Sequence, residues 1–263
     1  MTAPGGFSPS TPAPIATTRV LGVDACRAGW VGVVWDGGRP MALAARDIGT
    51  LVAAAEMEGP VAVVGIDIPI GLPDTGRRQA DLLAKQQIGR LRSSVFMTPV
   101  RPALQAETHA DAVAVNRELA GEGFSIQAFG LRTKVFEVEA FVRSEAGATR
   151  TVLEVHPEVS FARMNGGPLT ERKKTWAGAE VRRALLDEHD LGVTGVGALA
   201  GVDVGVDDVL DAAAAAWTAR RHTLGWSESL PGAPRSSATG GPRRSGCSHL
   251  AARSRLLRLP HAG

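Results

Sequence analysis

The most hydrophobic strand-like stretch of the chain runs from Val61 to Pro69 (VAVVGIDIP) and holds a single charged residue, Asp67. An uninterrupted apolar run of this kind predicts a central β-strand that is covered on both faces, because a strand with one face in solvent alternates apolar and polar residues. A carboxylate in such surroundings is costly unless it has a partner. Asp67 therefore constrains both the fold and the chemistry.

The segment before this strand reads as three shorter strands, over residues 18–24, 30–35 and 40–46. The turn sequences ACRAG and DGG separate them. Short β-rich runs joined by glycine turns predict an antiparallel meander. A helix is expected over 48–58, closed by Gly59-Pro60.

The segment after the central strand is mainly helical, with one further strand expected over 151–156. Residues 91–102, with two serines and two prolines, are expected to form a loop. The expected helices cover residues 76–90, 106–120, 126–144, 173–190 and 207–224. This alternation predicts an α/β fold, with a mixed sheet and helices on both faces.

The two ends of the chain differ from the rest in composition. Residues 1–17 carry no charged side chain and lack the basic start and apolar run of a signal peptide, so we expect a disordered leader. One domain is expected over 18–226. Residues 227–263 hold six arginines, one acid (Glu228) and many prolines, glycines and serines, and we expect a disordered, atypical arginine-rich tail.

The charge and cysteine content limit the class of protein. The formal net charge is +2, but the arginine-rich tail supplies the excess and leaves the expected domain slightly acidic, so the sequence pI near 8.8 is no evidence for nucleic-acid binding. Two cysteines make no disulfide framework, which is typical of a cytoplasmic protein. No apolar run reaches the roughly 20 residues of a membrane span.

Four aspartates are candidates for one metal site. Asp24 and Asp67 end predicted strands, where α/β sheets bind their ligands. Asp208 and Asp211 are three residues apart and would share a helix face, although Asp208 is also well placed to cap the helix. Converging carboxylates repel one another unless a cation neutralises them, and hard oxygen ligands select Mg²⁺ or Mn²⁺.

Further residues are candidates for supporting roles, each with an ordinary structural alternative. Glu154, in LEVHPE, could be a fifth ligand or a general base, with His156 as a proton carrier and Glu158 as a weaker candidate. Lysines at the start of a helix and basic or hydroxyl groups in a loop can hold phosphate. The candidate phosphate contacts are Arg27, Arg90, Arg92, Ser93, Ser94, Lys173 and Lys174.

Successive motifs of the chain resemble those of the predicted nucleases called domain of unknown function 429. The motifs are GVDACRAGW, GIDIPIGLP, GRLRSSVFMTP, EVHPEVSF with MNGGPL and KKT, and DDVLDAAAAAWTA. The resemblance implies a ribonuclease H-like fold, with Asp24, Asp67, Asp208 and Asp211 as metal ligands. DDVLDA is also similar to the last helix of Holliday-junction resolvases. After Trp226 we expect the chain to depart from the family, because relatives are expected to continue in an ordered segment that ends in an apolar strand-like stretch.

Three functions remain open, in decreasing order of expectation. The first is a metal-dependent nuclease that acts on nucleic acid or another phosphodiester substrate, with catalysis at the aspartates and Glu154. The second is a non-catalytic nucleic-acid or partner-binding module of the same fold. The third is a nucleotide-binding phosphotransferase, although DACRAG places Cys and Arg where small residues would cradle phosphates. The sequence leaves the oligomeric state open.

Overall fold

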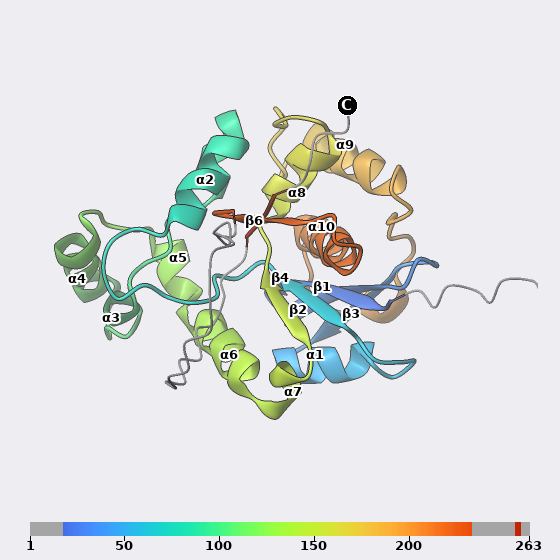
Figure 1. Cartoon of the computed structure of the whole chain (residues 1–263), viewed down its shortest axis with the longest axis horizontal. Helices are drawn as coiled ribbons and strands as arrows, with labels where there is room; N and C mark the ends of the chain where they lie inside the picture. The colour runs from blue at the N-terminus through green and yellow to red at the C-terminus, as the bar shows by residue number, and fades with distance from the viewer. Residues whose placement is uncertain (1–17, 233–255, 259–263) are drawn as a thin grey trace, which may run out of the picture.

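The computed structural model describes residues 18–232 and 256–258, and its centre is a five-stranded mixed sheet (Figure 1). The strands lie in the order β3-β2-β1-β4-β5. Neighbours among β1, β2 and β3 pair antiparallel, whereas β4 pairs parallel to β1 and β5 parallel to β4. The strands are β1 (Val20–Cys26), β2 (Gly29–Trp35), β3 (Met41–Ala45), β4 (Val63–Ile66) and β5 (Thr151–Glu154). The predicted meander and the mixed α/β class are confirmed.

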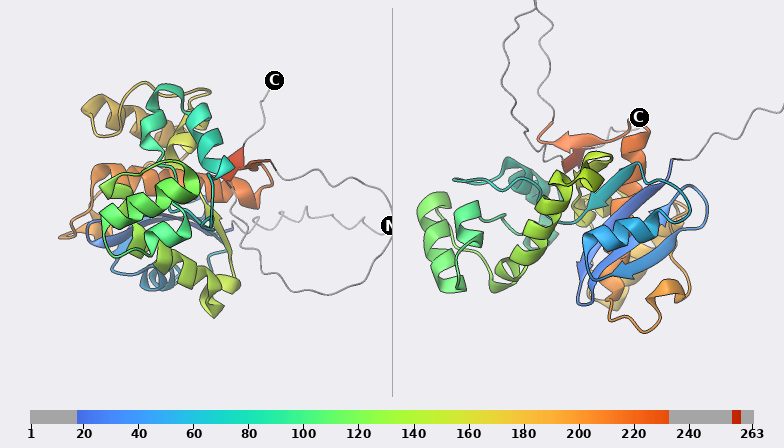
Figure 2. Two further views of the ribbon diagram at one scale, coloured as in Figure 1. Left: turned by 90° about the vertical axis from the view of Figure 1, so that its left-hand side faces the viewer. Right: turned by 90° about the horizontal axis from the view of Figure 1, so that it is seen from below.

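Helices cover both faces of this sheet, as Figure 1 shows, with α8, α9 and α10 on one side and α1 and α6 on the other. The region containing α3, α4 and α5 extends away from the sheet (Figure 2). The helices are α1 (Ile48–Ala55), α2 (Gln79–Gln87), α3 (Arg101–Leu104), α4 (His109–Ala120), α5 (Ile126–Gly130), α6 (Arg132–Arg143), α7 (Glu145–Ala148), α8 (Pro157–Met164), α9 (Trp176–Asp187) and α10 (Val206–Thr223), with 3-10 turns η1 (Gly89–Ser94) and η2 (Gly197–Leu199).

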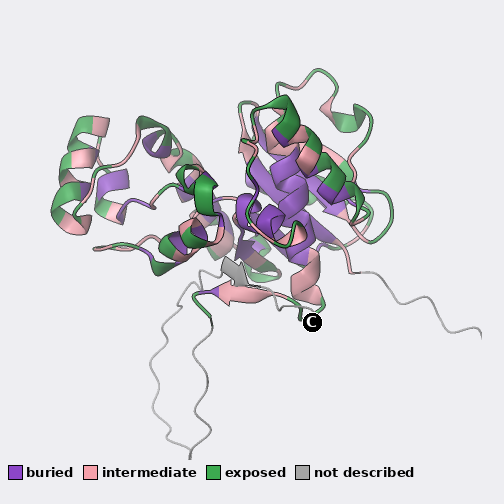
Figure 3. Ribbon diagram, turned by 90° about the horizontal axis from the view of Figure 1, so that it is seen from above, coloured by how far each residue is buried: buried purple, intermediate pink, exposed green. Residues whose placement is uncertain are grey.

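Helix α10 lies unusually close to the sheet because small residues meet on both sides of the contact. A Cβ atom added at Gly22 of β1 would lie 2.0 Å from the Ala212 carbonyl oxygen, and one at Gly65 of β4 would lie 2.8 Å from the Ala215 carbonyl oxygen. The alanines from Ala212 to Ala216 are fully buried (Figure 3). This close contact sets the distance between α10 and the sheet.

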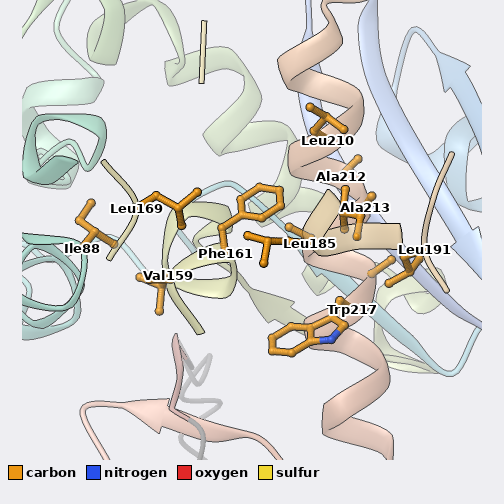
Figure 4. Close-up of a cluster of buried hydrophobic side chains, with 14 of the residues drawn as sticks. Ile88, Val159, Phe161, Leu169, Leu185, Leu191, Leu210, Ala212, Ala213 and Trp217 are labelled. Carbon is orange, nitrogen blue, oxygen red and sulfur yellow. The ribbon is translucent and has the colours of Figure 1, made fainter. Parts of the chain in front are cut away.

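The two faces of the sheet carry separate cores. On the α10 face, Figure 4 shows apolar side chains from α8, α9 and α10 meeting around Phe161, with Leu185 and Trp217 in the same cluster. On the other face, apolar residues of α1 and α6 pack against Leu21 and Val34. The sheet is therefore buried on both sides, as the run at 61–69 predicts.

Three regions differ from the sequence prediction. Residues 91–102, expected to form a loop, include most of the η1 turn and the start of α3. The single helix expected over 126–144 is two helices, α5 and α6, with Leu131 between them. Helix α8, which directly follows the strand expected over 151–156, begins at Pro157 and was not among the expected helices. Proline is favoured in the first turn of a helix, because its missing N–H has no partner there in any case.

The ordered part of the chain continues past residue 226. Leu230 is 1% exposed and belongs to the core on the α10 face, and β6 (Glu228–Leu230) pairs antiparallel with β7 (Leu256–Arg258). The leader at 1–17 and the remaining residues expected to form the tail lie outside the described residues. Among residues 18–232 and 256–258, no helix has the length and apolar character of a membrane span.

Candidate metal centre

The parallel pairing of β1 with β4 sets Asp24 beside Asp67. The ladder pairs Val23 with Ile66, and the Asp67 N–H donates to the Val23 carbonyl oxygen at 2.9 Å. One residue further along, Asp24 and Asp67 occupy equivalent positions at the carboxyl ends of neighbouring strands. Both share the face of Gly22 and Gly65, because alternate residues of a strand point to the same side. That face is the one covered by α10.

Helix α10 completes a cluster of three carboxylates. One oxygen from each of Asp24, Asp67 and Asp211 lies within 4.8 Å of the other two. Asp24 is 6% exposed and Asp211 is 1% exposed, whereas Asp67 keeps part of its surface open to an adjoining cavity. Three of the four aspartates that the sequence singles out therefore lie together, from two strands and the last helix.

The donor set fits a hard divalent cation. Oδ1 of Asp211 is buried without a hydrogen-bond partner among the described residues. A buried acceptor of this kind is costly unless something binds it. The three side chains offer oxygen ligands alone, which favours Mg²⁺ or Mn²⁺ over zinc. We therefore take these carboxylates as the candidate ligands.

Lys173 supplies a positive charge inside the cluster. Its Nζ donates to Oδ2 of Asp211 and lies 4.0 Å from Oδ2 of Asp207. Burial alone would lower the pKa of Lys173, but the carboxylates of Asp211, Asp67 and Asp24 outweigh it and raise that pKa. The lysine is therefore charged, and it neutralises part of the negative charge at the site.

The carboxylates bind protons more tightly than ordinary aspartates. Burial, followed by repulsion from Asp211, raises the pKa of Asp67 to about 8. Burial raises the pKa of Asp211 to about 6 against the opposing effect of Lys173. Burial and then the neighbouring Asp67 raise the pKa of Asp24 well above its usual range. Without a further cation, the cluster holds on to protons near neutral pH.

A buried ion pair holds the loop that carries Lys173. Arg182 of α9 is fully buried and donates to both carboxylate oxygens of Glu158, at 2.6 and 2.8 Å. Its other terminal nitrogen, Nη1, donates to the carbonyl oxygens of Glu171 and Gly178. Glu158 thus has a structural role, because it positions the arginine that fixes the loop two residues before Lys173.

Two predicted site residues lie outside the cluster. Oδ2 of Asp208 accepts the Gly205 N–H at 3.1 Å and so caps α10, although the residue lines the same cavity. Glu154 pairs with Ile66 in the sheet, one position away from Asp67 and therefore on the opposite face. Its Oε2 accepts from Arg78 Nη2 at 2.5 Å and from the Ile70 N–H at 2.7 Å. These contacts assign Glu154 to a buried ion pair rather than to the carboxylate cluster.

A cavity of about 640 Å³ adjoins the carboxylates and gathers several of the predicted phosphate contacts. Arg90, Ser93, Ser94, Lys173 and Lys174 line it. Arg92 is exposed and is absent from the lining, and Arg27 is an exposed residue whose Nη1 lies 3.3 Å from Oδ2 of Asp203.

His156 also lines this cavity. Burial, and then the charge of Lys173, lowers the pKa of His156 to about 4, so its ring is neutral at pH 7. Nδ1 of this ring is buried with no partner among the described residues. A neutral ring of this kind can exchange a hydrogen bond with a ligand in the cavity, but it is a poor proton carrier near neutral pH.

Among the lining residues that the sequence did not mark as candidates, three bear on ligand binding. Arg172 and Asp207 adjoin residues that it singles out, so proximity in the chain was the available signal. Phe96, in SSVFMTP, lines the cavity and is 48% exposed. No periodic pattern marks an aromatic residue in a loop as a binding residue.

Comparison with known proteins agrees with the motifs. A family model described as "Protein of unknown function (DUF429)" matches residues 22–236, which include all three carboxylates of the cluster. Comparison with curated proteins and with solved structures found no match. The match spans most of the chain, and the chain therefore belongs to the DUF429 family.

Proposed function

We propose that the protein is a nuclease that hydrolyses phosphodiester bonds with Mg²⁺ or Mn²⁺ held by Asp24, Asp67 and Asp211. The observation that carries the proposal is the convergence of these carboxylates within 4.8 Å at the end of the sheet, with one buried oxygen of Asp211 unpartnered. A site built only to be stable would not gather three like charges in one place. The adjoining cavity provides room for a substrate.

Divalent ions bound by such carboxylates activate water and stabilise the charge that develops on the phosphate oxygens. The chain's own residues have complementary tasks. The ammonium group of Lys173 can hold a phosphate oxygen, because it already faces the carboxylates from inside the site. Arg90 and Lys174 line the cavity as exposed cations and can bind flanking phosphates.

We propose further that the domain is ribonuclease H-like. The strand order β3-β2-β1-β4-β5, with an antiparallel meander followed by parallel strands, supports this assignment. So does the last helix, which lies over the central strands and delivers an aspartate to their ends. The motif resemblance points to the same fold, while fold alone does not establish activity.

A cleavage assay with matched variants tests the proposal. Labelled DNA and RNA, single-stranded, double-stranded and branched, are incubated with the protein and Mn²⁺. We expect wild-type protein to cleave at least one substrate, and Asp67→Asn and Asp211→Asn to abolish cleavage. The control is Asp207→Asn, which should retain most of the activity, because Asp207 lies outside the three-carboxylate cluster and its Oδ2 is 4.0 Å from each lysine.

Thermal denaturation gives a second, independent measurement. Mn²⁺ should raise the unfolding temperature of wild type and of Asp207→Asn, because a ligand that binds only the native state stabilises it. The unfolding temperature of Asp67→Asn should be the same with and without Mn²⁺. Absence of both the shift and cleavage would refute the metal site. A shift without any cleavage would refute the nuclease.

The second candidate function is a non-catalytic binding module. The contact between Lys173 and Asp211 favours this function, because the ammonium group of Lys173 can neutralise the carboxylates in place of a metal ion. Such a module should bind nucleic acid equally well with Mn²⁺ and with a chelator, and it should show no cleavage under either condition.

A further inference from the structure

The cavity beside the carboxylates has two chemically different walls. Asp24 and Asp67 form part of an acidic floor. The other wall consists of apolar side chains, which have no role in the proposed hydrolysis of a phosphodiester bond. They come from the η1 turn and the loop after it, and from the region of α3 and α6, and they are Leu91, Val95, Phe96, Met97, Leu104, Leu131 and Val135. A ligand that satisfies both walls must combine a charged group with an apolar one.

The size of the cavity limits the ligand further. At about 640 Å³ it lies in the range of pockets that enclose small molecules, which is roughly 300–1,000 Å³. A base within a duplex is stacked on both faces and paired along one edge, so it cannot enter a cavity of this kind unless it is extruded. The cavity therefore suits one nucleotide whose base is unpaired.

Phe96 provides the feature that an unpaired base would use. Its side chain is 48% exposed, and it lines the cavity, so one face of the ring is open to a ligand there. An exposed aromatic face stacks with any nucleobase. The cations Arg90, Arg172 and Lys174 are exposed and line the same cavity, where they can bind phosphates of the strand on either side of the base.

We propose that this cavity takes one unpaired nucleotide of a single-stranded nucleic acid, with its base against Phe96 and its phosphate toward the carboxylate cluster. The inference rests on the proposed function and names the substrate class for the same site. A free mononucleotide shares this chemistry but lacks the flanking phosphates, so it should bind more weakly than the strand.

Fluorescence of 2-aminopurine tests the proposal directly, because stacking on an aromatic ring quenches it. The full chain with Mn²⁺ is titrated into a phosphorothioate oligonucleotide that resists cleavage and carries a single 2-aminopurine. The same strand paired with its complement and the free 2-aminopurine nucleotide are measured alongside. We expect quenching with the single strand, weaker quenching with the nucleotide, and none with the duplex.

Variants assign the effect to the cavity wall. Phe96→Ala should weaken binding of the single strand by about fivefold or more, the fold-change that loss of one base–aromatic stack implies. Phe96→Trp keeps an aromatic face and should retain the quench. Leu82→Ala is the matched control, because Leu82 is 40% exposed and lies outside the cavity lining, and it should behave as wild type.

Failure of this inference is distinct from failure of the proposed function. Equal binding of single strand and duplex, no binding of either, or equal affinities for Phe96→Ala and Leu82→Ala would overturn the nucleotide pocket, even if an unmodified strand is cleaved. Quenching that depends on Phe96 would support the pocket even if an unmodified strand is never cleaved, and that outcome would count against the nuclease alone.

Discussion

At the scale of single residues, Lys173 most affects how the carboxylate cluster behaves without metal. It faces Asp211 directly, and its charge also reaches Asp67 and Asp24. The side chain is 29% exposed, whereas that of Asp211 is 2% exposed, so the contact belongs to the interior. Lys173 and the proposed metal would therefore be alternative sources of positive charge for the same carboxylates.

Replacing Lys173 by methionine separates these two roles. Loss of one partner of a buried ion pair costs about 3–5 kcal/mol, and the partial exposure of Lys173 places the expected loss near the lower end. The metal-free Lys173→Met protein should therefore be destabilised by about 3 kcal/mol, and Mn²⁺ should raise its unfolding temperature more than that of wild type. Chemical and thermal denaturation measure both effects.

Lys174→Met is the control for this change. Its side chain is 81% exposed, and its Nζ lies 4.0 Å from Oδ2 of Asp207. Surface ion pairs of this kind contribute little, so stability and the response to Mn²⁺ should match wild type. Equal behaviour of the two methionine variants would show that Lys173 does not act as the counter-ion of the cluster.

The residues of the site could be predicted from the sequence only in part. Asp24 and Asp67 can be predicted because each lies near the end of an apolar strand-like run, and Asp211 because it is three residues from Asp208 in a segment expected to be helical. Asp208 shares a helix face with Asp211 by spacing, but the first turn of a helix offers unpaired N–H groups, and its carboxylate binds one of them. The partner of Glu154 is Arg78, 76 residues away, which no local pattern indicates.

At the scale of elements, the contact between α10 and β1 determines whether the site forms. Gly22 permits the close approach, because a Cβ there would meet the backbone of Ala212 at 2.0 Å and of Ala216 at 2.1 Å. Backbone atoms of a packed helix cannot give way as a flexible side chain can. The helix would have to move as a unit, and Asp211 would move with it.

Gly22→Ala should therefore impair both stability and the metal site. Overpacking costs about 1–3 kcal/mol or more, and a clash with a helix backbone belongs to the upper end of that range. We expect a lower unfolding temperature by circular dichroism and a reduced shift with Mn²⁺. Gly38→Ala is the control, since the added Cβ meets only Oδ1 of the neighbouring Asp36. A stable Gly22→Ala protein with a full Mn²⁺ response would contradict this account.

The elements themselves were predicted well where periodicity is strong and poorly where tertiary contacts decide. The strands and α10 follow from apolar runs and from an alanine-rich pattern. The break between α5 and α6 at Leu131 has no proline to mark it, and α5 ends at Gly130, a weak signal. Helix α8 was missed because His156-Pro157 signals both the end of a strand and the start of a helix.

At the scale of the whole molecule, the buried carboxylates make global stability depend on pH. The pKa of Asp67 is raised from an ordinary value of 3.8 to about 8. The native metal-free state therefore keeps a proton that the unfolded chain releases at lower pH. This contribution to stability is complete below the ordinary pKa and is lost as the pH rises through the native one.

Asp67→Asn removes this titration while leaving the other groups in place. In a chelator, the free energy of unfolding of wild type should fall relative to that of the variant as the pH rises from about 4 to about 8. Denaturant unfolding at several pH values measures the difference in free energy of unfolding between wild type and variant. Groups other than Asp67 titrate in both proteins, so their effects largely cancel in this difference. A difference that stays constant with pH would mean that Asp67 ionises normally.

The three carboxylates come from positions 24, 67 and 211, which span nearly the whole folded chain. No partly folded intermediate that lacks either the first strand or the last helix can present the complete set. A divalent ion bound by all three carboxylates would therefore stabilise the native state and no partly folded state that lacks one of them. It should thus slow unfolding more than it speeds refolding, because an ion that needs all three ligands binds only states in which the first strand and the last helix have docked.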